Sequence, residues 1–548
     1  MSGVEAATSL ALHLSSMKYK PGFFNQAEED YEVWHIASGP FWVLPTYLPQ
    51  KASESGFTTA TMNFVPLDMS LYELSRRPPG TSGVRFGPTT PDQVDKKDKY
   101  FKEALGEEYG KIGGVNLTDS RGNNSERPPW VGISDNYAGF VRSGAIKVMA
   151  GRAVSVEPSN TALKKLTIES PNGSKCLNHV SAIVMATGYS PSDSLSFLPQ
   201  DILSTLEYSP EDQFIPLILD SWSTAHSEIP DLGFVGFYRG AFWGPAELQA
   251  ECLAQAWAAT NLEGGLLRFL SDEEQGERAA ERQKAREYRD TKPSALRGQF
   301  PLGDYVGLME TLARQANRQR ISMIRPVIDS DVQPVGPVIP ARYPPTAPSQ
   351  SHGDPAGDSS EEMVITMKAL VKILNPEIYH NSAATNSTIF RALHGDWVFE
   401  RVESSHGNSQ EIRSSGKTTF HPRYPSHPDF QAEYLCEENC DSSESTAHSV
   451  FQLRDASRFS RTPGIFVRSG DDAHQHAASE PALALKISPG AEVMDSGQAY
   501  IPASSFDISR ERQTYEFYLD RVTITSWCHL ICSVRDGTRT TRYSRPSA

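Results

Sequence analysis

The stretch Val184-Met185-Ala186-Thr187-Gly188-Tyr189 decides the fold, because it places small residues where an apolar run ends. Residues 180–185 are apolar except for Ser181, and such runs are typical of strands buried in a parallel sheet. Small residues at the carboxyl end of such a strand let the backbone approach a cofactor that lies across the sheet edge. The stretch predicts an α/β fold with a cofactor beside its last four residues, although tight packing would also explain the small side chains.

A second motif, Gly244-Pro245-Ala246-Glu247-Leu248-Gln249, opens a long helix that we expect over residues 246–260. A proline just inside a helix start, preceded by glycine, gives a preorganised N-terminus with free backbone N–H groups and a positive dipole end. Such an end can stabilise a negatively charged group. An ordinary capped helix is the alternative, in which Glu247 only complements the helix dipole.

Helical and strand-like patterns alternate from residue 1 to about residue 325, as an α/β architecture requires. Residues 2–14 predict a helix, and residues 31–36 predict a short strand. Residues 144–156 alternate in the manner of one arm of a hairpin. The first part of the chain therefore predicts helices packed on a sheet.

The composition changes after residue 326, where prolines gather between Pro334 and Pro355 among Gly, Ser and Asp. This composition predicts an extended, poorly ordered linker. A helix is expected over residues 361–374, and four short strands are expected at residues 397–402, 449–453, 515–519 and 522–527. The spacing of the strands favours an antiparallel sheet or small barrel.

The predicted barrel has an aromatic interior, because Phe420, Tyr434 and Phe451 fall in its strands. A ligand cavity is one possibility, and a filled core, which small barrels have more often, is the favoured one.

Charge and composition exclude two classes of partner. The formal net charge of -15, without clustered Lys and Arg, argues against nucleic acid. No apolar run approaches the roughly 20 residues that cross a bilayer, and no secretory signal opens the chain, so we expect a cytoplasmic protein.

Neither Cys436-x3-Cys440 nor Cys528-x3-Cys532 has the spacing of a common zinc knuckle, so ordinary thiols are favoured over a metal site.

Together, the two motifs resemble the second half of flavin-containing monooxygenases, in which an Ala-Thr-Gly-Tyr strand end precedes a Pro-x-Glu-Leu-Gln-Ala helix. Pro40-Phe41-Trp42-Val43-Leu44-Pro45 is similar to the family's Trp-x-x-Pro stretch, and Ile133-Ser134-Asp135-Asn136-Tyr137 resembles its return to the FAD domain. The likeness covers residues 1–320. It implies an FAD- and NADPH-dependent oxidoreductase that oxygenates a small organic substrate. It also implies Ala186, Thr187, Gly188 and Tyr189 beside FAD, and Pro245, Glu247 and Gln249 under the isoalloxazine ring.

The start of the chain resembles the end of the family's second glycine fingerprint, Gly-x-Ser-x-Ser-Gly-x-Glu. The resemblance implies that Ser2, Gly3 and Glu5 lie beside the NADPH pyrophosphate, at a helix N-terminus. The sequence holds neither the preceding strand nor a G-x-G-x-x-G unit in a strand-turn-helix context, so we expect an N-terminally truncated chain with weakened FAD binding. Ala37, Ser38 and Gly39 follow the predicted strand in place of a base for a 2′-phosphate.

The expected fold class is α/β, an incomplete two-dinucleotide-binding-domain flavoprotein fold, followed by a Pro-rich linker and a small antiparallel β-barrel-like domain. Its parts are a remnant of the NADPH-binding subdomain (1–60), the C-terminal part of the FAD-binding oxidoreductase domain (61–325), the linker (326–375) and the β-domain (376–548). The β-domain resembles a domain of unknown function fused to such flavoproteins in filamentous fungi. The alternative is a non-catalytic flavoprotein remnant that binds a ligand or partner through its β-domain. No catalytic residue is assigned.

Overall fold

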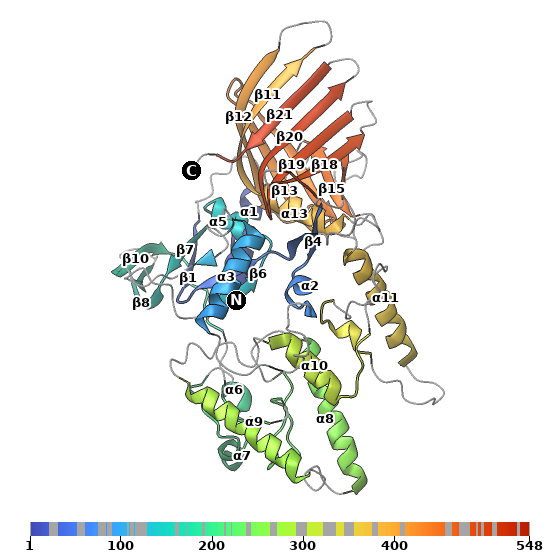
Figure 1. Ribbon diagram of the computed structural model, residues 1–548. Coiled ribbons are helices and arrows are strands. Elements are labelled where there is room, and N and C mark those ends of the chain that lie inside the picture. Colours follow the sequence, from blue (N-terminus) through green and yellow to red (C-terminus); the bar gives the residue numbers. More distant parts are fainter. Residues whose placement is uncertain are drawn as a thin grey trace.

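A ten-stranded antiparallel barrel, an α/β layer beneath it and a helical part at the lower end make up the described structure (Figure 1). The structure is a computed structural model of the 548-residue chain. The structure describes residues 2–20, 31–51, 61–74, 84, 90–106, 109, 114–115, 129–158, 164–170, 173–188, 192–212, 215–220, 222–236, 243–263, 271–291, 304–321, 336–344, 356–374, 382–405, 411–454, 463–470, 483–488, 491–494, 498–506, 512–533 and 537–546.

The C-terminal barrel confirms the predicted antiparallel β-domain. Its ring is closed by the pairing of β16 with β18, in which Ile487 faces Ala503. The ring strands are β11 (Gly395–Ser404), β12 (Ile412–Arg423), β13 (Ala432–Cys440), β14 (Thr446–Arg454), β15 (Gly464–Ser469), β16 (Leu483–Ile487), β18 (Ala499–Phe506), β19 (Arg512–Asp520), β20 (Thr523–Ser533) and β21 (Gly537–Ser544).

Alternation of side chains fills one end of the barrel. In β19, Tyr515, Phe517 and Leu519 are buried and point inward, as the period of two in a strand requires. Helix α13 (Ala383–Leu393) closes this end, and its Ile389 and Phe390 join the same apolar core. Phe420, Tyr434 and Phe451 all belong to that core, so the expected aromatic interior is confirmed.

Residues from the first part of the chain extend the barrel sheet. Strand β17 (Ala491–Val493) pairs with β18 and also with β4 (Thr61–Pro66), which pairs in turn with β3 (Tyr47–Lys51). Met62 and Phe64 of β4 enter the barrel core. The two predicted halves of the chain therefore share one sheet.

Beneath the barrel lie two short parallel pairings. Strand β1 (Val33–Ala37) runs parallel to β7 (Ile146–Ala150), and α1 (Ser2–Lys18) packs on them with α5 (Tyr137–Arg142). A separate sheet holds β2 (Phe41–Leu44), parallel to β6 (Trp130–Ile133), and β5 (Gly114–Val115). The predicted helix at residues 2–14 and strand at residues 31–36 are confirmed. The two-dinucleotide-binding-domain arrangement stays a prediction.

The expected single hairpin arm at residues 144–156 is wrong, because it divides into two strands. After β7, the chain turns at Gly151 into β8 (Arg152–Pro158), which joins an antiparallel sheet with β9 (Lys164–Ser170) and β10 (Gly173–Val180). A Cβ atom on Gly151 would lie 2.6 Å from the carbonyl oxygen of Glu169, so the turn needs glycine.

The expected buried parallel strand at residues 180–185 is also wrong. Strand β10 ends at Val180, and the chain then continues without regular secondary structure. Val184 and Met185 are 63% and 77% exposed. Apolar side chains form a buried strand only where neighbouring strands pair with it and a second layer covers it. No described strand pairs with this segment.

The lower part of the molecule is helical. It contains α6 (Ser192–Leu195), α7 (Gln200–Thr205), α8 (Trp243–Glu263), α9 (Asp272–Asp290) and α10 (Tyr305–Gln315), and it confirms the helix predicted at residues 246–260. Helices α8 and α10 pack through Leu248, Met309 and Leu312. None of the described helices is both long enough and apolar enough to span a bilayer.

Residues 336–344, within the predicted linker, are packed rather than poorly ordered. Val338, Arg342 and Tyr343 are buried, and the turn η5 (Pro340–Arg342) begins at a proline. The Arg342 guanidinium donates to the carbonyl oxygens of Pro337 at 2.8 Å and Ile321 at 3.0 Å. These bonds offset the cost of burying the Arg342 cation. Residues 336–344 can therefore pack, and the expectation of a poorly ordered linker is wrong for them. Helix α11 (Ala356–Leu374) confirms the helix predicted at residues 361–374, and the remaining linker residues lie outside the described ones.

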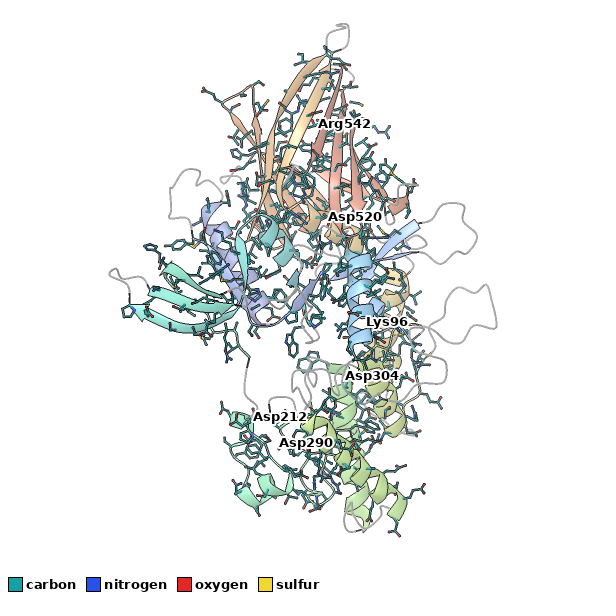
Figure 2. The ribbon with its side chains drawn as sticks, turned by 60° about the vertical axis from the view of Figure 1, so that its left-hand side comes forward. Lys96, Asp212, Asp290, Asp304, Asp520 and Arg542 are labelled. Atoms are coloured by element: carbon teal, nitrogen blue, oxygen red, sulfur yellow. The ribbon has the colours of Figure 1, made fainter. Side chains whose placement is uncertain are left out.

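Two further helices connect the layers. Helix α2 (Leu67–Leu71) follows β4, and α3 (Pro91–Leu105) begins with a capping box between Thr90 and Gln93. At the end of α3, a Cβ atom on Gly106 would lie 2.8 Å from Oδ2 of Asp520 in the barrel. Figure 2 shows Asp520 at the lower end of the barrel, above the helix that carries Lys96.

A buried ion pair joins the barrel to α1. Arg423 in β12 donates from Nε to Glu433 in β13 at 2.7 Å, and both side chains are almost fully buried. Arg423 also donates to the carbonyl oxygen of Tyr19 at 3.0 Å, just beyond the end of α1. Glu433 accepts further hydrogen bonds from Ser426 and Gln452. The pair therefore fixes both the outer barrel wall and the end of α1.

We expect Glu433→Ala to lower the free energy of unfolding by about 3–5 kcal/mol, because Arg423 would remain buried without its carboxylate. Urea unfolding followed by circular dichroism measures this change. Glu411→Ala is the matched control, since the Glu411–Arg413 pair is exposed and should contribute little. Equal effects of the two substitutions would contradict the role given to the buried pair.

Candidate functional site

The residues predicted to hold the NADPH pyrophosphate lie in the first turn of α1. A Cβ atom on Gly3 would lie 2.8 Å from Nε2 of His35, so this turn rests directly on β1. Ser2 and Glu5 are exposed. A helix start beside parallel strands is the setting in which dinucleotide sites are built, because its free N–H groups point outward.

His35 is the chemical neighbour of this turn. Its Nδ1 lies 2.6 Å from the hydroxyl of Tyr137, and the two rings meet edge to face. Burial lowers the pKa of His35 to about 4 and raises the pKa of Tyr137. Both groups are therefore neutral near pH 7, and His35 adds no cation for a phosphate.

The residues predicted beside FAD are differently placed. Thr187 and Gly188 are exposed, and Ala186 is partly exposed. Gly188 has a φ of 88°, which favours glycine, but a Cβ atom there would meet nothing within 4 Å. The turn, rather than the close approach of another group, explains this glycine. Tyr189 lies outside the described residues.

The residues predicted under the flavin ring open α8. Pro245 is buried and Glu247 is exposed. Gln249 is 1% exposed, donates from Nε2 to the carbonyl oxygen of Trp222 at 2.9 Å and accepts from the N–H of Gly236 at 3.0 Å. Its amide thus joins two loop segments. Figure 1 places α8 in the lower helical part and α1 in the α/β layer, so the structure does not bring these two predicted sets together.

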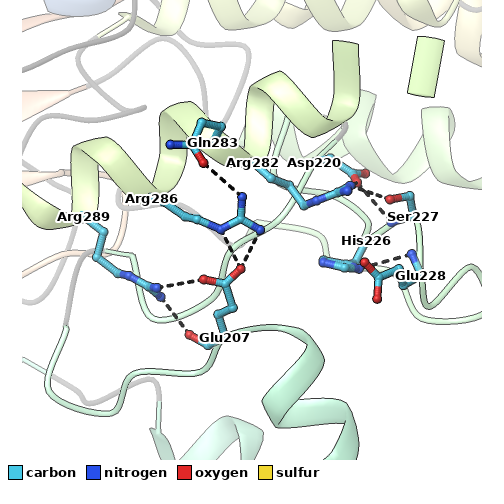
Figure 3. A network of polar contacts seen from close by, with 9 residues as sticks. All are labelled: Glu207, Asp220, His226, Ser227, Glu228, Arg282, Gln283, Arg286 and Arg289. Carbon is cyan, nitrogen blue, oxygen red and sulfur yellow. Dashed lines mark hydrogen bonds and ion pairs between the residues drawn. The ribbon is translucent and has the colours of Figure 1, made fainter. Parts of the chain in front are cut away.

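A charged network in the helical part was not expected from the sequence. Asp220 is fully buried and accepts hydrogen bonds from Arg282 and from the N–H of Ser227, while Glu207 pairs with Arg286 and Arg289 (Figure 3). The three arginines come from α9 and the acceptors come from the segment before α8. The carboxylates are used in holding α9 in place, so we interpret the network as structural.

The barrel interior holds a second polar layer, above the aromatic end closed by α13. Arg401 pairs with Glu438, and Nε of Arg401 donates to Oγ1 of Thr541 at 3.2 Å. The hydroxyl of Tyr543 donates to Glu438 at 3.2 Å. The Arg401 and Glu438 side chains are 16% and 20% exposed, so this layer is not fully closed to solvent.

A neutral histidine lies on the next strands of the same wall. Nε2 of His529 lies 2.9 Å from Oε1 of Gln513, and the ring stacks on Tyr515 with 4.2 Å between centroids. Burial lowers the pKa of His529 to about 3, so the imidazole is uncharged near pH 7.

Among the described residues that face the barrel interior, two buried polar atoms have no hydrogen-bond partner. They are Nε1 of Trp527 and Oγ1 of Thr418, in side chains that are 4% and 1% exposed. Leaving such a group unpaired costs about 1–3 kcal/mol. Buried polar atoms that lack a protein partner usually bind water or a ligand. The barrel interior is therefore the strongest candidate for a functional site among the described residues.

The sequence carries a signal for this layer, although no motif marks it. Trp397, Phe399 and Arg401 have the same parity in β11, so a period of two places Arg401 on the inward face with the aromatic residues. Thr418 and Trp527 lie within stretches that were already assigned to the predicted barrel. Their lack of partners depends on the packing of several strands and cannot be read from one strand.

The outer wall of the barrel offers a weaker candidate. A surface depression of about 520 Å³ overlies β11, β12, β20 and β21. Its rim carries Glu400, Lys417, Asp441 and Arg542, the last of which is labelled on the barrel in Figure 2. The mixed charges of this rim select no class of ligand.

We expect the His35→Gln variant to lose less free energy of unfolding than the wild-type chain when the pH is lowered. Buried neutral His35, with a pKa of about 4 against an ordinary 6.5, favours the folded state above pH 6.5, and this contribution is lost as pH falls towards 4. The wild-type chain should therefore lose about 1–2 kcal/mol more than the variant between pH 7 and pH 5. Urea unfolding at the two pH values tests this, and identical losses would contradict it.

Comparisons with known proteins do not bear on this site. Searches against known protein families, curated proteins and solved structures found no match to the chain. The function must therefore be argued from the residues themselves, which are the first turn of α1, the start of α8 and the interior of the barrel.

Proposed function

We propose that the chain is an FAD- and NAD(P)H-dependent oxidoreductase of the flavin-containing monooxygenase type that oxygenates a small organic substrate. The observation that carries the proposal is the first turn of α1, which rests on β1 where β1 runs parallel to β7. This geometry suits a dinucleotide pyrophosphate. A cytoplasmic location, expected from the sequence, belongs to the same proposal.

The nicotinamide cofactor fits α1 in part. The backbone N–H groups of Ser2 and Gly3 belong to the first turn and would hold a pyrophosphate. Glu5 already complements the positive end of the helix, and its charge would oppose the anion. Ala37 and Ser38, at the end of β1, offer no cation to a 2′-phosphate, so NADPH, the nicotinamide cofactor we expect, would be held through its pyrophosphate.

The described residues do not by themselves form an FAD site. Thr187 and Gly188 are exposed, and the Gln249 amide is already bonded to two backbone groups. When bound, FAD would supply the redox chemistry and the activation of oxygen. Its assignment rests on the resemblance of the two motifs, and we expect this chain to retain it weakly.

The second candidate is a non-catalytic protein that binds a small ligand through its barrel. Trp527 and Thr418 favour it, because each presents an unpaired polar atom in the barrel interior. In this case the α/β layer and the helical part would serve as support, and neither cofactor would be needed.

We expect the purified chain to bind NADPH, and Gly3→Val to weaken binding at least tenfold, because a branched side chain displaces His35 and distorts the first turn of α1. Isothermal titration calorimetry measures this. Gly276→Ala is the control, since a Cβ atom at this position in α9 meets nothing within 4 Å. Absorbance between 350 and 500 nm, recorded after incubation with excess FAD and desalting, tests the flavin.

The outcomes separate the two candidates. Retained flavin bands together with NADPH binding at α1 support the oxidoreductase, and NADPH-dependent oxygen consumption would then be assayed. Two results would contradict the oxidoreductase and favour the ligand-binding protein. In the first, the chain is colourless and does not bind NADPH. In the second, the chain is colourless and the Gly3→Val variant binds NADPH as tightly as the wild-type chain does.

A further inference from the structure

The two unpaired polar atoms belong to one inner surface of the barrel. Thr418 pairs in register with Trp397 on one side and Glu438 on the other, and Trp527 pairs with Phe517 and Tyr543. Residues paired in register share a face of the sheet. Since Trp397, Phe517 and Tyr543 point inward, Thr418 and Trp527 point inward as well.

Aromatic rings dominate the surroundings of these atoms. The Trp527 ring stacks on Tyr543 with 3.6 Å between centroids and an interplanar angle of 2°. Trp527 also lies near Phe420 and Trp397, with rings tilted steeply to its own. Aromatic faces and edges prefer offset-stacked or edge-to-face partners, so such a wall favours a flat ring over a flexible alkyl chain.

The charges of the inner layer are already balanced. Arg401 pairs with Glu438, and Arg539 pairs with Glu403 at 2.8 Å. Burial keeps His529 neutral near pH 7. We find no unpaired cation among the described inward-facing residues that would bind a carboxylate or phosphate. Burial of a ligand charge without a partner would be costly, so the arrangement selects an uncharged molecule.

The unpaired atoms define the polar group of that molecule. The indole N–H of Trp527 can only donate, and the hydroxyl of Thr418 can donate or accept. A carbonyl oxygen or an uncharged ring nitrogen would satisfy the indole, and a donor or an acceptor on the ligand would satisfy the hydroxyl. A bound water could also satisfy them, and that outcome is separated by experiment below.

We propose that the barrel binds an uncharged aromatic molecule with a hydrogen-bond acceptor, which Trp527 and Thr418 recognise through Nε1 and Oγ1. The site involves neither α1 nor α8. The molecule could be the substrate of the proposed oxidoreductase or the ligand of a non-catalytic protein. The inference thus stands apart from flavin and nicotinamide binding.

The test uses the full chain without FAD or NADPH and three probes that share one ring system. These are 2-acetylnaphthalene, which is neutral and has a carbonyl acceptor, 2-naphthoate, which is charged, and 2-ethylnaphthalene, which lacks an acceptor. Equilibrium dialysis measures binding. We expect 2-acetylnaphthalene to bind about tenfold tighter than 2-naphthoate or 2-ethylnaphthalene. A tenfold difference in affinity corresponds to about one hydrogen bond between uncharged groups.

Two substitutions locate the binding site. Thr418→Val and Trp527→Phe should each weaken binding of the ketone roughly three- to tenfold while leaving binding of 2-ethylnaphthalene nearly unchanged. Thr540→Val is the control, because Thr540 is next to inward-facing Thr541 in β21 and so faces outward. Thr418→Val is close to isosteric and removes an unpaired group, so its thermal unfolding midpoint should equal or exceed that of the wild-type chain.

Each other outcome overturns the proposal. Binding of 2-ethylnaphthalene as tight as that of the ketone would mean that the polar atoms are not used, and preference for 2-naphthoate would mean that the charge argument is wrong. Absence of binding by every probe, with Thr418→Val folded, would indicate a filled core with bound water. A missing flavin in the cofactor experiment leaves all of these results unaffected.

Discussion

The pairing of β16 with β18 is the constraint on which the barrel depends. Only a short ladder, Lys486 with Ser504 and Ile487 with Ala503, converts a curved sheet into a ring. Closure satisfies the backbone groups of both strands and removes an edge that would otherwise pair with other chains. It also fixes which side chains face one another across the interior, so the positions of Trp527, Thr418 and the Arg401–Glu438 pair all follow from it.

The sequence predicted the elements whose signals are local. Helices α1 and α8 and the alternating barrel strands were found because their periods appear within a single segment. Residues 180–185 show the limit of such reasoning, since an apolar run becomes a buried strand only if other strands cover it. Residues 336–344 show the converse, because a proline-rich segment packs where Arg342 finds carbonyl acceptors on neighbouring residues. The strands that would have to cover residues 180–185, and the Ile321 carbonyl that accepts from Arg342, lie outside these two segments.

Some parts of the candidate sites could be recognised from a single segment of sequence, and others could not. The glycines near α1 and α8 were recognised from motifs, yet Gly244 serves packing, with a Cβ position 2.9 Å from Met309 and Pro340. The interior layer of the barrel was missed because its members come from several strands. Arg401, Glu438 and Tyr543 meet only after β11, β13 and β21 have joined the ring. A motif search along one chain segment cannot find a site assembled in this way.

The junction between β4 and β17 has a consequence for how the chain is made. Met62 pairs with Ala491, so the first strand must wait for a partner that is translated 429 residues later (491 − 62). Contacts of such long sequence separation form slowly, and exposed strands are prone to aggregation while they wait. Pro49 in β3, which cannot donate a backbone hydrogen bond, makes that early hairpin a poor template for other chains. Until β17 has been translated, the sheet that β3 and β4 join remains unfinished, and the order of synthesis limits when this part of the fold can form.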